Sequence, residues 1–283
     1  MHGRLIRLGD VADRVIGGHG LPLSASQLLG QSLALAGLLG SALKERGSIS
    51  IQTRTDGPVP QLYADCEAPG KLRGYARAAD GATAKAGPLG HGHLAFTIDQ
   101  GDGSDRYQGV LGLKDETLAA AAQIYFEQRE ALPTLLRLAV AESFIATRDA
   151  KTRSGQWRAG GLLLQPLGAA RSERDTDDDG WRRVRMLAET VEDHELLDPM
   201  LSAERLLLRL FHEEGVIIER TVAHSAYCKC SRRRIVDVLQ TFGPDELGDM
   251  RDAAGLIAVK CEFCAATYDI GFEEIDRSGA GAA

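Results

Sequence analysis

The stretch that decides the fold of the C-terminal region opens with Cys228-Lys229-Cys230 and closes with Cys261-Glu262-Phe263-Cys264. Two closely spaced cysteine pairs on either side of a loop are typical of a module that folds around one tetrahedral Zn²⁺. The first pair has a single intervening residue, whereas C-x-x-C is the commoner spacing. A pair this close along the chain can also close into a disulfide. The spacing therefore predicts a site with a metal-bound state and an oxidised state.

Other cysteines and histidines fit a ligand role less well. His224 lies four residues before Cys228 and could replace one ligand, but four thiolates already complete a tetrahedron. We expect His91-Gly92-His93 to form a solvated loop, because no cysteine or carboxylate partner is close in sequence. No helix N-terminus or basic cluster marks Cys66 as a nucleophile, so we expect a half-buried thiol. The predicted metal ligands are thus Cys228, Cys230, Cys261 and Cys264.

Composition restricts the class of protein. The chain has 283 residues, 44% of them hydrophobic and 26% charged, which favours a soluble globular protein with more than one domain. A net charge of −7 disfavours nonspecific binding to nucleic acid or to anionic membranes. Serine and glutamine interrupt the most apolar stretch, residues 21–43, so we expect a buried amphipathic helix there and no membrane span. Residues 1–10 show no secretory signal, which predicts a cytoplasmic protein.

Residues 1–170 are predicted to form an α+β domain, a core of mixed sheet and helix. A helix is expected over 22–44, and a second over 116–130 with Asp115 as its N-cap. Between and after them, alternating apolar residues predict strands at 48–54, around 62–63, and at 72–78, 94–98, 107–113, 135–140 and 161–165. These strands and helices do not alternate regularly, which favours α+β over α/β.

Residues 171–215 are predicted to form a helical linker, and residues 216–283 a zinc-binding module. The linker is expected to hold helices over 181–197 and 202–214, broken at Asp198-Pro199. Its second helix has an apolar face opposite many charges, which predicts packing against another surface. The members of that face are Leu206, Leu207, Leu210 and Phe211.

Arg232-Arg233-Arg234 is either a nucleic-acid patch or charge compensation for the thiolates. Four thiolates on one Zn²⁺ leave a charge near −2, and residues 221–283 carry seven basic and ten acidic residues. A nucleic-acid-binding module is normally basic, so we expect compensation and no nucleic-acid partner. The sequence also has no P-loop, no G-x-G-x-x-G and no convincing Ser-His-Asp order. We therefore expect a protein that is not an enzyme.

Oxidation is expected to change this module. Thiolates near arginines are accessible to peroxide, and the expected products are the disulfides Cys228–Cys230 and Cys261–Cys264. Each disulfide lies within one cysteine pair and does not replace the link that zinc makes between the pairs. We therefore predict reversible unfolding of the module and release of the linker beside it.

The chain resembles the redox-regulated thirty-three-kilodalton heat-shock protein (chaperonin) family, holdase chaperones of bacteria. The resemblance covers nearly the whole length, and its most specific part is the two cysteine pairs followed by Tyr268. In the first domain it rests on Asp56-Gly57-Pro58, Arg73-Gly74-Tyr75-Ala76-Arg77, Arg106-Tyr107-Gln108-Gly109-Val110, Leu132-Pro133-Thr134 and Ala159-Gly160-Gly161-Leu162-Leu163-Leu164-Gln165. Members usually carry a further strand ahead of the region matching Gly3 to Leu8, and often an aromatic residue where this chain has Ile270.

The resemblance implies a client-binding and dimerising core domain, a metastable linker and a C-terminal zinc domain whose ligands are the four cysteines. It implies an inactive, reduced, zinc-bound form. The oxidised form, with one disulfide within each cysteine pair, releases zinc, partly unfolds, forms a homodimer and holds unfolding client proteins without ATP. The alternative is a zinc-ribbon interaction or RNA-binding protein with permanent structural zinc. The two hypotheses differ in whether oxidation abolishes function or switches it on.

Overall fold

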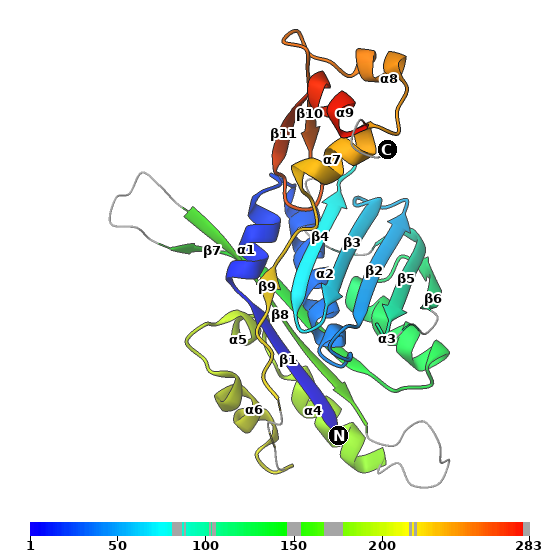
Figure 1. The fold of residues 1–283 in the computed structure, drawn as a ribbon. Helices are drawn as coiled ribbons and strands as arrows, with labels where there is room; N and C mark the ends of the chain where they lie inside the picture. The colour runs from blue at the N-terminus through cyan, green and yellow to red at the C-terminus, as the bar shows by residue number, and fades with distance from the viewer. Residues whose placement is uncertain are drawn as a thin grey trace. The chain divides into compact units, whose positions relative to one another are not determined.

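The computed structural model describes residues 1–80, 87, 89–101, 103, 106–145, 154–166, 178–214, 217 and 220–279. The chain divides into two units, Met1–Ala226 and Tyr227–Ala283, and each is described here by itself. Sheets and helices both contribute to each unit (Figure 1). The prediction of an α+β protein is therefore confirmed.

The larger sheet of the first unit has six strands in the order β6-β5-β2-β3-β4-β9. All neighbours are antiparallel except β4 and β9, which pair in parallel at Lys71–Leu72 and Ser225–Ala226. Buried and less buried residues alternate along β2, so one face of the sheet packs on the core. The strands are β2 (Ser48–Thr55), β3 (Gln61–Glu67), β4 (Lys71–Arg77), β5 (His91–Asp99), β6 (Tyr107–Lys114) and β9 (Ser225–Ala226).

The smaller sheet is antiparallel, with β8 between β1 and β7. Its strands are β1 (His2–Leu8), β7 (Leu135–Ile145) and β8 (Ser154–Gln165). Neighbouring side chains of a strand point to opposite faces of the sheet. Consecutive apolar residues in β8 therefore make both faces of this sheet apolar. Leu163 packs into the main core, whereas Leu162 and Leu164 pack into a second cluster. The run of three leucines thus belongs to a strand that is covered on both sides.

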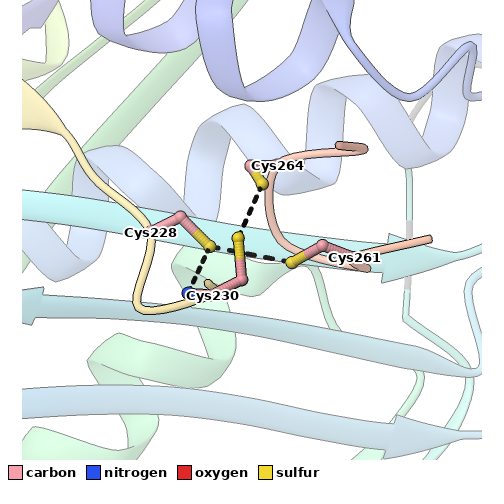
Figure 2. A group of neighbouring side chains, drawn as sticks. All are labelled: Cys228, Cys230, Cys261 and Cys264. Atoms are coloured by element: carbon pink, nitrogen blue, oxygen red, sulfur yellow. Dashed lines mark hydrogen bonds between the residues drawn. The ribbon is translucent and has the colours of Figure 1, made fainter. Parts of the chain in front are cut away.

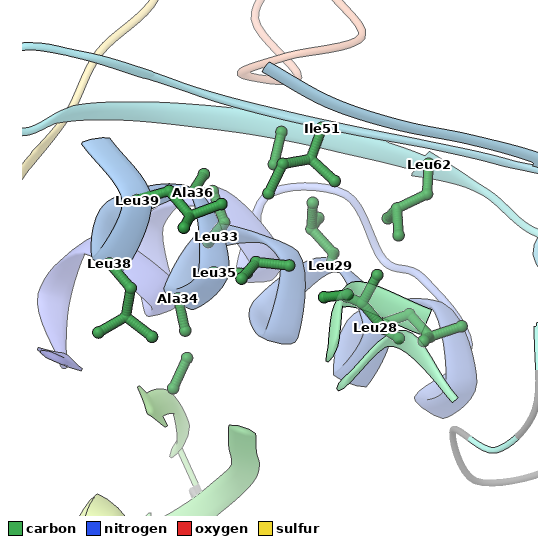
Figure 3. Close-up of a cluster of buried hydrophobic side chains, with 14 of the residues drawn as sticks. Leu28, Leu29, Leu33, Ala34, Leu35, Ala36, Leu38, Leu39, Ile51 and Leu62 are labelled. Atoms are coloured by element: carbon green, nitrogen blue, oxygen red, sulfur yellow. The ribbon is translucent and has the colours of Figure 1, made fainter. Parts of the chain in front are cut away.

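Helix α2 (Leu23–Gly40) lies between the two sheets and is buried almost all round (Figure 3). Its leucines reach Ile51 and Leu62 of the larger sheet, and its glycines allow the smaller sheet to approach closely. A Cβ atom on Gly30 would lie 2.8 Å from Cγ1 of Val140. The prediction of an amphipathic helix is wrong here, because a central helix has no solvent face. Among the helices that the structure describes, none is both long and apolar enough to cross a membrane.

Helices α1 (Asp10–Gly17) and α3 (Leu118–Arg129) complete the core. The N-cap of α3 is Thr117, whose Oγ1 accepts a hydrogen bond from the backbone N–H of Ala120 at 3.3 Å. The predicted cap, Asp115, is wrong: its φ is 75° and its carboxylate accepts from the backbone N–H of Gly90 at 3.0 Å. A contact between distant segments decides the role of this aspartate.

The helices of the predicted linker segment, called the linker below, cover the second face of the smaller sheet. They are α4 (Asp178–Glu189), α5 (Asp193–Leu197) and α6 (Ala203–Phe211). Their apolar side chains form one cluster with Leu135, Ala139, Leu162 and Leu164 of the sheet. The linker members of this cluster are Val184, Ala188, Val191, Leu196, Leu206, Leu210 and Phe211. The predicted packing of the linker face is confirmed, but the helix expected over 181–197 is interrupted, since α5 begins with its own capping box at Glu192 and Glu195.

Two arginines of the smaller sheet anchor the linker backbone. Arg7 donates hydrogen bonds to the carbonyl oxygens of Leu196 at 3.1 Å, Glu195 at 2.7 Å and Leu201. Arg137 donates to the carbonyl of Val191 at 3.2 Å. These bonds give main-chain carbonyl groups before, within and after α5 a charged donor. The linker is therefore held both by apolar packing and by charge-assisted hydrogen bonds to its main chain.

The second unit has a small core of its own. Its elements are α7 (Arg232–Leu239), α8 (Pro244–Asp249), β10 (Leu256–Lys260), β11 (Thr267–Gly271) and α9 (Phe272–Gly279). β10 and β11 form an antiparallel hairpin. Val236, Leu239, Leu247, Ile257, Ile270 and Ile275 form the buried cluster. Ile270, at the position where the family often has an aromatic residue, is fully buried in it.

Candidate metal centre

The four predicted ligands lie together in the second unit (Figure 2). The sulfur atoms of Cys228, Cys230, Cys261 and Cys264 are all within 4.8 Å of one another. The distance is 3.7 Å between the sulfurs of Cys228 and Cys261 and 3.4 Å between those of Cys230 and Cys264. Sulfurs at the corners of a tetrahedron with Zn–S bonds of about 2.3 Å are roughly 3.8 Å apart. The donor type and the spacing both fit one Zn²⁺.

Local structure places each pair. Cys228 and Cys230 come directly before α7, whose N-cap Ser231 accepts from the backbone N–H of Arg234 at 3.3 Å. The backbone N–H of Cys230 points at the sulfur of Cys228, 3.4 Å away.

The second pair occupies the turn between β10 and β11. The backbone N–H of Ala265 donates to the carbonyl of Cys261 at 2.9 Å, and the N–H of Cys261 donates to the carbonyl of Ala266 at 2.9 Å. Ala265 adopts a φ of 57°, in the left-handed region, where a residue other than glycine costs roughly 1–3 kcal/mol. The hairpin thus turns Cys261 and Cys264 toward the same point.

The four thiols differ in their surroundings. Burial raises the pKa of Cys230, but hydrogen bonds from Tyr268 and from the neighbouring thiols outweigh burial and bring that pKa to about 7. Burial raises the pKa of Cys264 to about 12 and also raises the pKa of Cys228. Tyr268 Oη lies 3.3 Å from the sulfur of Cys230. Metal binding would hold all four as thiolates.

The arginines beside the first pair have different partners. Arg232 makes two 2.7 Å bonds to the carboxylate of Glu274 and one of 2.6 Å to the carbonyl of Asp269. The hydrogen bonds from Arg232 lower the pKa of Glu274 to about 2. Arg234 donates to the carbonyl of Lys229, between the two cysteines, at 2.8 Å. Arg234 thus contacts the backbone of the first cysteine pair, whereas Arg232 joins α7 to α9. Charge compensation of the thiolates stays a prediction.

The remaining candidates lie in the first unit. Cys66 is fully buried, not half-buried as predicted, and burial raises its pKa to about 12. His224 has a buried Nε2 without a hydrogen-bond partner in the described part of the chain, and burial lowers its pKa. His91 and His93 are exposed as predicted but lie on β5, so the predicted loop is wrong. None of the three histidines belongs to the cysteine cluster.

One residue of the site was missed by sequence reasoning as a functional group. In the sequence Tyr268, four residues after the last cysteine, is only part of the family resemblance, with no chemical role assigned to it. Its partner Cys230 lies 38 residues earlier, in the segment before α7, so the contact forms only in the folded unit. No local spacing rule indicates such a contact.

Comparison with known proteins supports the same family. The family model described as "Hsp33 protein" matches residues 1–271. The 33 kDa chaperonin of Caulobacter vibrioides (strain NA1000 / CB15N) is 39% identical over 281 residues, with 95% of this chain and 90% of that protein covered. The 33 kDa chaperonin of Cronobacter sakazakii is 34% identical, with 99% and 90% covered.

The fold agrees as well. A crystal structure of the 33 kDa chaperonin from Thermotoga maritima superposes with a TM-score of 0.77 at 21% identity, covering 97% of this chain and 92% of that one. At this identity the likeness concerns the fold. The match over residues 1–271, together with the identity to the two curated relatives, confirms the resemblance noted in the sequence: the chain belongs to the Hsp33 protein family.

Proposed function

We propose that this protein is a redox-regulated, ATP-independent chaperone of the holdase type. The observation that carries the proposal is the group of four cysteine sulfurs in a small, separate unit of the chain. The reduced, zinc-bound protein is inactive. Oxidation of the four cysteines releases zinc, partly unfolds the protein and lets it bind unfolding proteins before they aggregate. The relatives named 33 kDa chaperonin support this assignment.

The chemistry of the switch lies in the cysteine pairs. Bound Zn²⁺ would hold the four sulfurs as thiolates and link the two pairs. With peroxide, one thiolate of a pair forms a sulfenic acid and hydroxide leaves. The neighbouring thiolate then attacks that sulfur, and a second hydroxide leaves as the disulfide forms. The two thiolates of a pair thus give two electrons to one peroxide. Four thiolates become two disulfides, and no ligand set for zinc remains.

The linker converts this local change into client binding. In the proposal, residues 1–170 are the client-binding and dimerising core, residues 171–215 the linker and residues 216–283 the redox-switch domain. Unfolding of the switch domain releases the linker, which uncovers the apolar face of the smaller sheet around Leu135, Leu162 and Leu164. Exposed apolar area of this kind binds unfolded chains. The oxidised protein forms a homodimer and acts in the cytoplasm, without catalysing a reaction.

The decisive experiment is an aggregation assay with reduced and peroxide-treated protein side by side. A thermally unfolding client such as citrate synthase is heated with each form, and light scattering is followed. The oxidised protein should suppress scattering at near-stoichiometric ratios, and the reduced protein should not. Equal activity of the two forms, or loss of activity on oxidation, would instead favour a protein with permanent structural zinc.

The zinc content of the reduced protein is a first prediction. Reduced, metal-replete protein should carry one zinc per chain, because four sulfurs form one tetrahedral set. A thiol-modifying reagent should release it, as followed with a chromogenic chelator. Cys66→Ser should leave the zinc content unchanged, since Cys66 is buried in the other unit. Elemental analysis without zinc would contradict the proposal.

The disulfide pairing is a second prediction. Peptide mapping of oxidised protein should find mainly Cys228–Cys230 and Cys261–Cys264. In the folded unit, sulfurs of different pairs lie close, with 3.7 Å between Cys228 and Cys261. Once zinc leaves and the unit opens, only cysteines of the same pair stay tethered by a short chain. Mainly Cys228–Cys261 and Cys230–Cys264 would mean that the unit stays folded on oxidation, and the switch would fail.

A further inference from the structure

The phenol of Tyr268 is in hydrogen-bond contact with one ligand sulfur. Its Oη lies 3.3 Å from the sulfur of Cys230. Resting on the zinc site of the proposed function, we propose that Tyr268 is a positioning residue that donates a hydrogen bond to the Cys230 thiolate, strengthens zinc binding and makes this sulfur a poorer nucleophile while zinc is bound. The hydroxyl is the donor because a thiolate has no proton to give.

The hairpin holds the phenol in place. Tyr268 lies on β11 opposite Val259 of β10, and its ring packs beside the buried cluster that contains Ile257 and Ile270. Cys230 belongs to the other cysteine pair, directly before α7. The hydroxyl therefore connects a sulfur of the first pair to the hairpin that carries the second pair. This contact joins the two pairs without passing through the metal.

The chemical consequence follows from the charge of the site. Four thiolates on one Zn²⁺ carry a net charge near −2, and a hydrogen bond to one sulfur draws electron density from its lone pairs. Outer-shell donors of this kind orient ligands, and their loss typically costs about 10–100-fold in metal affinity. The same withdrawal of density makes the sulfur react more slowly with an electrophile. Removal of the hydroxyl should thus weaken zinc binding and speed reaction at Cys230 alone.

The test compares Tyr268→Phe with the wild type as full-length, reduced, zinc-loaded protein. With iodoacetamide, the cysteine sulfur forms an S–C bond and iodide leaves, and mass spectrometry of peptides gives the rate at each cysteine. The variant should alkylate at Cys230 several-fold faster than the wild type, with the other three rates unchanged. Competition with a chromogenic chelator should give a zinc dissociation constant about 10-fold higher.

Tyr227→Phe is the matched control, because it removes the other phenol of residues 227–283. It should leave the rate at Cys230 unchanged. An unchanged Cys230 rate in Tyr268→Phe would overturn the inference, and so would an equal rise at all four cysteines, which reports general loosening. A variant without zinc would overturn it too, because the hydroxyl would then be indispensable to the fold. All rates come from reduced protein, so a failure of the oxidised protein to act as a holdase would be a separate result.

Discussion

Removal of zinc from the reduced protein should unfold residues 227–283 and leave the two sheets of the first unit intact. The second unit has only a small buried cluster, from Val236 to Ile275, to hold it together. Metal binding contributes about 10–16 kcal/mol of coupled folding free energy in small zinc modules. This exceeds what such a core supplies alone, since chains of this size are marginal without staples. The first unit has a far larger core around α2 and does not depend on the metal.

Hydrogen exchange with and without a strong chelator would measure this effect. Amides of the β10–β11 hairpin, such as those of Ile257 and Ile270, should lose protection, whereas amides of β2 and β3 should keep it. Cys261→Ser should reproduce the loss without chelator. Cys66→Ala is the control, because it removes a thiol from the other unit and should leave the hairpin protected. A hairpin that stays protected in chelator would mean that zinc is not what folds this unit.

Leu206→Asp should make the reduced, zinc-loaded protein suppress aggregation. Leu206 is fully buried between the linker and the smaller sheet, with 0% of its surface exposed. A charge at this point would have to be desolvated in the docked state. The free energy of linker docking would become less favourable by several kcal/mol, on the order of the cost of a large core substitution. Undocking avoids that cost and exposes the apolar sheet face. Light scattering with a heated client is the measurement.

The neighbouring leucines provide the controls. Leu208 is 62% exposed, so Leu208→Asp adds the same charge without touching the docked face and should stay inactive until oxidised. Leu207 is half-buried against the same cluster, and Leu207→Asp should have an intermediate effect. The rate of amide hydrogen exchange over residues 193–211 should be lowest in Leu208→Asp, higher in Leu207→Asp and highest in Leu206→Asp. If Leu206→Asp is inactive when reduced although its linker exchanges freely, then linker release is not the gate.

Much of the fold could be predicted from the sequence because its signals are local. The alternation of residues 48–54 predicts a strand, and each cysteine pair defines its own half of the site. The predictions are wrong where a contact between distant segments determines the structure. Aspartate is a residue type favoured at an N-cap, yet Asp115 accepts a hydrogen bond from the backbone N–H of Gly90, which lies 25 residues earlier. The solvent-free position of α2 and the phenol at Cys230 likewise depend on tertiary pairing, which periodicity and spacing do not encode.

The arginine anchors of the linker have a consequence for how this protein can change over evolution. Arg7 and Arg137 contact carbonyl groups of the main chain, at Glu195, Leu196, Leu201 and Val191. Every amino acid offers the same carbonyl, so substitutions in the linker leave the acceptors in place. The outward-facing side chains of the linker therefore tolerate substitution, while the burial of its leucines sets how strongly the linker docks. Under the proposed function, substitutions at a few apolar positions would change how strongly the linker docks, and with it the oxidant level that activates the protein, while the arginine contacts stay the same.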